Sequence, residues 1–147
     1  MLINKANRTE TISILLSLLF FYTGFSKFFN MDLFMHFMNS QPFPKWAAAL
    51  FIYLLPSSEL LIAGCLLFSW TRKMGLYSAG ILFFLFILYS AATSFHLFSD
   101  RLPCPCGGIL TNLSWKQHIY LNSFLFLLTV LGMTHGKQKI KQPALGV

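Results

Sequence analysis

Long apolar runs separated by short polar segments dominate the chain. Each run is close to the length of helix, roughly 20 residues, that crosses the hydrocarbon core of a bilayer. The runs cover residues 11–29, 46–70, 74–98 and 115–133. This pattern predicts an all-α integral membrane protein in which residues 1–147 form a single domain, a four-helix transmembrane bundle.

A shorter amphipathic segment lies between the first two runs. Over residues 31–40, apolar side chains alternate at helical spacing with Asp32, His36 and Asn39; the apolar ones are Met31, Phe34, Met35 and Met38. Such a pattern is typical of a short helix that lies in the membrane interface. Pro42 and Pro44 are expected to end it.

Two local signals refine the predicted spans. Pro56 lies inside the second run, where it removes one backbone hydrogen bond, and hydroxyls such as Ser57 and Ser58 are expected to compensate. Ser114 followed by Gln117 three residues later has the spacing of a capping box, which predicts that the last helix begins there.

Composition supports a membrane location. Hydrophobic residues make up 56% and charged residues 10% of the chain, and its mean hydropathy is +0.64, whereas soluble domains carry about 25% charged residues. The net charge of +7 does not indicate a nucleic-acid partner, because the Lys and Arg residues form no continuous basic face. The expected environment is the lipid bilayer.

The basic residues predict the topology. Four spans place both termini on one side, together with seven basic residues: Lys5, Arg8, Arg72, Lys73, Lys137, Lys139 and Lys141. The other side has four: Lys27, Lys45, Arg101 and Lys116. The positive-inside rule then puts both termini, including a basic tail over residues 134–147, in the cytoplasm. For a bacterial inner membrane, the segment between spans three and four faces the periplasm.

That outward segment carries a cysteine pair, Cys104-Pro105-Cys106, followed by two glycines. A disulfide between cysteines so close in sequence closes a small, strained ring that exchanges readily with other thiols. Redox chemistry is therefore the favoured interpretation, and an unreactive structural clip is the alternative. A metal site is not expected, because two sulfurs leave a tetrahedral ion short of ligands. The third cysteine, Cys65, is predicted to be an apolar filler in the second span.

Several polar residues in the spans need an explanation. Glu59 lies near the middle of the second span, where a charge costs roughly 2.5–3.5 kcal/mol, so it must face protein or water. Lys27 is the candidate partner, although its place near the outer end of span one demands a long reach or a shifted helix. His118 is a candidate proton acceptor for the cysteines or a plain interfacial residue. Asn122 lies one turn further on the same helix face, and for Glu59 and Asn122 interhelical hydrogen bonding competes with proton relay.

Five short motifs in a fixed order resemble one family. They are Gly24-x-x-Lys27, Leu55-Pro56-x-x-Glu59-Leu60, Gly64, the Cys-x-Cys-Gly-Gly segment, and His118-x-x-x-Asn122. This order resembles the MauE branch of the DoxX-like membrane proteins over nearly the whole chain. The resemblance implies a four-helix membrane protein that works with a periplasmic thioredoxin-like partner in making or delivering disulfides, in the namesake case for methylamine utilisation.

The leading hypothesis is a membrane thiol–disulfide oxidoreductase or redox relay in which Cys104 and Cys106 exchange disulfides with a partner protein. A quinone is a candidate electron acceptor. Because the chain has one usable cysteine pair, that pair would have to react with the quinone directly. The alternative is a non-catalytic membrane scaffold or assembly factor with a structural Cys-Pro-Cys clip. A transporter that uses Glu59, Lys27 and Asn122 is less favoured, because four spans make a narrow bundle.

Overall fold

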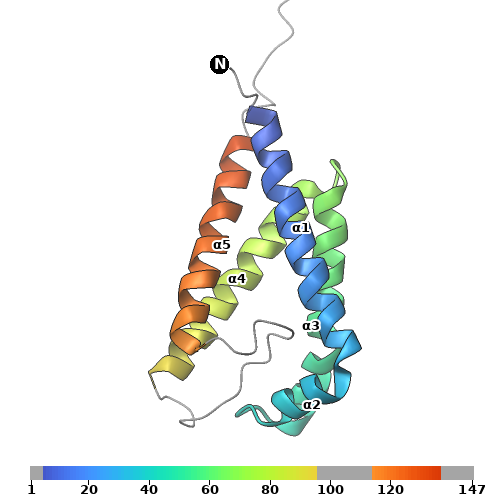
Figure 1. The fold of residues 1–147 in the computed structure, drawn as a ribbon, viewed down its shortest axis with the longest axis vertical. Coiled ribbons are helices and arrows are strands. Elements are labelled where there is room, and N and C mark those ends of the chain that lie inside the picture. Colours follow the sequence, from blue (N-terminus) through green and yellow to red (C-terminus); the bar gives the residue numbers. More distant parts are fainter. Residues whose placement is uncertain (1–4, 96–113, 137–147) are drawn as a thin grey trace, which may run out of the picture.

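A computed structural model describes residues 5–95 and 114–136, and every regular element within these ranges is a helix (Figure 1). It has five helices in the described part of the chain: α1 (Lys5–Phe29), α2 (Met31–Asn39), α3 (Lys45–Leu67), α4 (Arg72–Ser94) and α5 (Trp115–Gly136). The prediction of an all-α protein is therefore confirmed for these residues.

Three of the described helices are long and apolar enough to cross a membrane: Arg8–Phe29 within α1, Lys45–Leu67 and Arg72–Ser94. They correspond to the first three predicted spans. The fourth predicted span also forms a helix, α5, but it is not among the three. Its first turn carries Lys116, Gln117 and His118, and these polar side chains lower its mean hydropathy.

The helix ends differ from the prediction by a few residues. Span two was expected to reach residue 70, but α3 ends at Leu67, because Phe68 adopts an extended backbone with ψ of 130°. Span three was expected over 74–98, but α4 starts at Arg72 and ends at Ser94. Residues 96–98 of that span lie outside the described residues.

The start of α5 is the one predicted from the capping box. The Ser114 backbone N–H donates to Gln117 Oε1 at 2.8 Å, and the Gln117 N–H donates back to Ser114 Oγ at 3.4 Å. These two reciprocal bonds satisfy backbone donors that the first turn of a helix leaves without partners. They explain why the helix begins at Trp115.

The four long helices enclose a common apolar core. Helix α1 packs on α3 and α5, and α4 packs on α3 and α5. Phe20 of α1 and Phe83 of α4 stack with ring centroids 5.1 Å apart. Around them lie buried residues from three helices, namely Leu16, Ile62, Ala63, Leu66, Leu76 and Ala79.

Helix α2 lies beyond the end of α1, beside the first turns of α3 (Figure 1). Its existence is confirmed, and its apolar face is directed at the protein: Phe34 and Met38 are buried with Ile52 of α3. Because α2 lies between α1 and α3 in the chain, α3 begins beyond the end of α1. This offset sets which residues of α1 and α3 lie side by side.

Candidate functional site

A buried ion pair joins α1 to α3. Lys27 Nζ donates to both carboxylate oxygens of Glu59, at 2.9 Å to Oε1 and 2.8 Å to Oε2. The two residues are 2% and 3% exposed, so neither charge is solvated by the exterior. Removing a single charge from water costs several kcal/mol, so each of these two charges must be compensated by groups within the protein.

The close approach of α1 and α3 explains how Lys27 reaches Glu59. A Cβ added at Gly24 would lie 3.1 Å from Pro56 O and 3.1 Å from Leu60 Cγ, so only glycine fits there without a shift. Further along the same interface, Ser17 Oγ donates to Ala63 O at 2.8 Å. The expected pairing of Lys27 with Glu59 is present, and of the two ways expected for it, a long reach or a shifted helix, it is the second: the offset created by α2 places this turn of α1 level with Glu59.

The ammonium of Lys27 has its three donors directed at protein atoms. Besides the two Glu59 oxygens, it donates to the Thr23 carbonyl oxygen at 3.3 Å. The Phe34 ring of α2 lies with its centroid 5.9 Å from Nζ, within the range of a cation–π contact. Phe34 is 2% exposed, so α2 covers the pair on this side.

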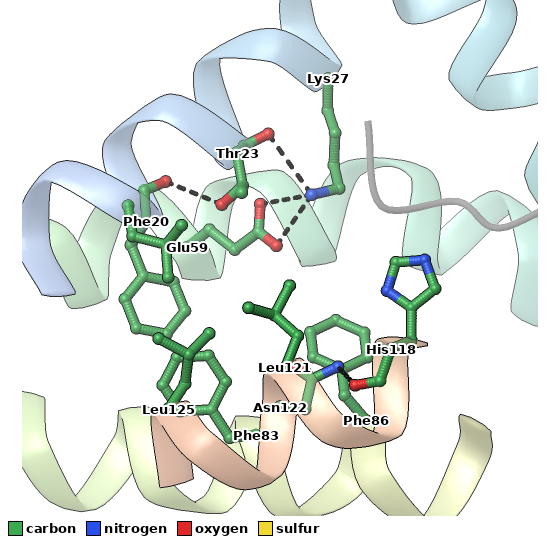
Figure 2. Close-up of a pocket in the computed structure, with 11 residues that line it drawn as sticks. Phe20, Thr23, Lys27, Glu59, Phe83, Phe86, His118, Leu121, Asn122 and Leu125 are labelled. Atoms are coloured by element: carbon green, nitrogen blue, oxygen red, sulfur yellow. Dashed lines mark hydrogen bonds and ion pairs between the residues drawn. The ribbon is translucent and has the colours of Figure 1, made fainter. Parts of the chain in front are cut away.

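A small cavity of about 40 Å³ lies against the ion pair, between it and α4 and α5 (Figure 2). In Figure 2, Lys27 and Glu59 face His118, Leu121 and Asn122 across this space. Its walls are mainly aromatic and aliphatic. The lining residues are Leu19, Phe20, Thr23, Lys27, Glu59, Phe83, Phe86, His118, Leu121, Asn122 and Leu125.

His118 and Asn122 supply the polar groups on the far wall. His118 is 1% and Asn122 8% exposed, so His118 is buried rather than a residue on the bundle surface. Asn122 Nδ2 donates to the His118 carbonyl oxygen at 2.8 Å. Sequence reasoning left interhelical hydrogen bonding and proton relay both open for Asn122, and this contact runs one turn back along α5. The structure therefore brings four predicted polar residues to one cavity.

An aromatic contact chain fixes the start of α5 next to this site. The rings of Tyr89 and Trp115 meet edge to face at 5.8 Å, and Trp115 lies 6.1 Å from the His118 ring. Tyr89 also donates a hydrogen bond to Gln41 Oε1. Sequence reasoning missed Gln41, Tyr89 and Trp115, because no spacing in the sequence relates residues so far apart.

The two predicted redox cysteines, Cys104 and Cys106, lie outside the described residues. The described residues nearest to them in the chain are Phe95 after α4 and Ser114 before α5. In Figure 1 these helix ends lie at the same end of the bundle as α2. Cys65 is a half-buried free cysteine two residues before the end of α3, and the carbonyl of Cys65 accepts a hydrogen bond from Thr71 Oγ1 at 2.9 Å.

The size of the cavity limits what it can hold. A dry protein cavity that binds benzene measures about 150 Å³, whereas one water needs roughly 10–15 Å³. At about 40 Å³ the cavity has no room for the six-membered ring of a quinone.

Comparison with known proteins gives one match. A family model described as methylamine utilisation protein MauE matches residues 5–135, a range that includes all five helices except the last residue of α5. No curated protein matches the chain. No solved structure matches it either.

Proposed function

The chain belongs to the MauE family of methylamine utilisation proteins, and from this premise we propose that it is a membrane thiol–disulfide oxidoreductase or redox relay. Its reactive group is the Cys104–Cys106 pair, and its partner is a periplasmic thioredoxin-like protein or a substrate protein that contains disulfides. The membrane character rests on three apolar helices. The redox role rests on the Cys-Pro-Cys segment and on the site at the adjoining end of the bundle.

The exchange consists of two balanced substitutions at sulfur. A partner thiolate attacks one sulfur of the Cys104–Cys106 disulfide, forms a mixed disulfide and expels the other cysteine as a thiolate. A second partner thiolate then breaks the mixed disulfide, so that the partner leaves oxidised and the pair remains as a dithiol. The reverse sequence reduces a partner disulfide. Two electrons move in either direction, and no other reagent is consumed.

One observation supports this proposal most: the buried Lys27–Glu59 pair and the cavity beside it share the end of the bundle to which the cysteine segment is joined. His118 lies in the first turns of α5, four residues after Ser114. Intramembrane charges are expensive and usually mark functional sites. A polar site placed here suits proton transfer to and from reacting thiols.

We also propose the arrangement in the membrane. Helix α5 is the fourth span of the bundle, the termini and the tail over residues 134–147 are cytoplasmic, and the cysteine pair faces the periplasm across the bacterial inner membrane. A quinone that reoxidises the pair would have to meet it outside the cavity described above, because the cavity is too small for the ring.

Trapping of mixed disulfides tests the proposed exchange. In cells that express the full chain with Cys65→Ala, the single variants Cys104→Ala and Cys106→Ala leave one thiol that cannot resolve a mixed disulfide. We expect at least one of them to accumulate a covalent adduct that a reductant releases. The matched control is the same chain with both Cys104→Ala and Cys106→Ala, which should form no adduct.

The competing function is a scaffold or assembly factor in which the cysteines form a structural clip. The saturated hydrogen bonding of Lys27 is also what a purely structural pair would show. A scaffold predicts no adduct with either single variant and full function after replacement of both cysteines. That result would contradict the redox proposal.

A further inference from the structure

Helix α2 covers the Lys27–Glu59 pair without sharing the main core of the bundle. Its buried side chains, Phe34 and Met38, form a hydrophobic cluster with Ile52, and this cluster is separate from the apolar core that the four long helices enclose. Small clusters beside a main core hold peripheral segments in place. Segments with few buried apolar contacts open at a lower free energy than core helices. The packing of α2 is therefore that of a local unit.

Both connections of α2 interrupt the helical backbone. At its start, Asn30 has φ of −112° and ψ of 46°, and its side chain donates back to Ser26 O at 3.2 Å. At its end, residues 40–44 contain Pro42 and Pro44 and separate α2 from α3. A helix moves as a rigid body when a few residues at its ends absorb the change in φ and ψ. Helix α2 has such residues on both sides.

A hydrogen bond ties the far end of α2 to α4. The Tyr89 hydroxyl donates to Gln41 Oε1, and the Gln41 amide donates to the Phe37 carbonyl oxygen of α2 at 2.9 Å. The Phe43 ring stacks on Tyr89 with the centroids 5.7 Å apart. In Figure 1, α4 and α5 spread away from α1 and α3 toward this end of the bundle. The Gln41–Tyr89 hydrogen bond, named the latch below, thus joins the two helix pairs where they diverge.

We propose that α2 is a cover that opens as a unit, that the latch holds it closed, and that its opening gives water access to the Lys27–Glu59 pair. The Phe34 ring lies against the pair, with its centroid 5.9 Å from Lys27 Nζ. Opening costs Lys27 no hydrogen bond, because its three acceptors belong to Thr23 of α1 and Glu59 of α3. The cover does not depend on the proposed thiol–disulfide exchange.

Two tyrosines of α4 provide matched variants. Tyr89→Phe removes the hydroxyl of the latch and keeps the ring that Phe43 and Trp115 contact. Tyr77 lies on the outer side of the same helix and is 51% exposed. Tyr77→Phe therefore removes the same hydroxyl group away from the cover.

Amide hydrogen exchange of the full chain in lipid bilayers measures the opening. We expect the amides of Phe34 and Met38 to exchange faster than those of Leu66 and Ala79, which are 0% exposed. In Tyr89→Phe their exchange should accelerate roughly two- to tenfold, which corresponds to the loss of one hydrogen bond, and Tyr77→Phe should change nothing. Amides of α2 as protected as those of Leu66 and Ala79 would overturn the cover. Exchange unchanged in Tyr89→Phe would overturn the latch.

Carbodiimide labelling of carboxyl groups measures water access to the pair. With a water-soluble carbodiimide and an amine, Glu59 should react more slowly than Asp32, which is exposed on α2. Tyr89→Phe should raise the Glu59 rate by the factor seen in hydrogen exchange and leave the Asp32 rate unchanged. Glu59 labelling that stays constant while α2 exchanges faster would show that opening does not reach the pair. Glu59 labelling as fast as that of Asp32 in the unsubstituted chain would show that α2 does not cover it.

Discussion

At the scale of single residues, the buried charges determine what the bundle can tolerate. Lys27 and Glu59 compensate each other at 2.8 Å with side-chain exposures of 1% and 4%. By contrast, Arg72 and Glu10 lie 3.7 Å apart with exposures of 20% and 55%. Burial makes the first pair mutually dependent, because either charge alone would be left without compensation.

We predict that Lys27→Met destabilises the protein by about 3–5 kcal/mol, since it leaves the Glu59 carboxylate buried and unpaired. Replacing both partners, Lys27→Met with Glu59→Leu, should recover most of this loss because no charge remains. Glu10→Gln is the control and should cost at most about 1 kcal/mol, the usual contribution of an exposed pair. Denaturant unfolding in detergent measures all three. A double variant no more stable than the single one would contradict the assignment of the loss to the unpaired charge.

At the scale of helices, the packing of α1 on α3 depends on a missing side chain. Gly24 lies against Pro56 O and Leu60, whereas nothing lies within 4 Å of a Cβ built on Gly64. Both glycines are inside helices and both belong to the motifs noted in the sequence. Only Gly24 is required for the helices to approach each other.

Gly24→Ala is therefore expected to lower the stability by about 1–3 kcal/mol, as overpacking of a tight interface usually does. Gly64→Ala should be neutral or should stabilise by about 0.5–1 kcal/mol, because alanine is the better helix former and has space. Thermal unfolding of the two variants in the same detergent provides the comparison. Equal losses from both substitutions would show that the α1–α3 contact is looser than described.

At the scale of the whole molecule, the sequence predicted where the helices lie in the chain better than how far neighbouring helices are shifted along each other. Ser114 and Gln117 located the start of α5, because a capping box is a local signal. The level of Lys27 relative to Glu59 was left open between a long reach and a shifted helix, since it depends on where α2 folds. The burial of His118 was also missed, because it depends on how α5 packs against helices far away in the sequence, which a lone histidine near a helix start does not indicate.

The proposed topology makes a prediction for the whole chain. A membrane-impermeant maleimide should label reduced Cys104 and Cys106 from the periplasmic side in the Cys65→Ala background. As a control, Lys139→Cys in a chain without the three native cysteines should be labelled only after the inner membrane is permeabilised. Protection of the native pair in cells with only the outer membrane permeabilised would reverse the orientation.

The most direct measurement of the proposed redox role is the reduction potential of the Cys104–Cys106 pair. The full chain with Cys65→Ala is equilibrated in bilayers with thiol–disulfide buffers, and the free thiols are then counted by alkylation. A redox-active pair should equilibrate with a potential above roughly −300 mV, the limit below which structural disulfides are found. A pair that stays oxidised in buffers more reducing than this, or that never forms a disulfide, would contradict the exchange function.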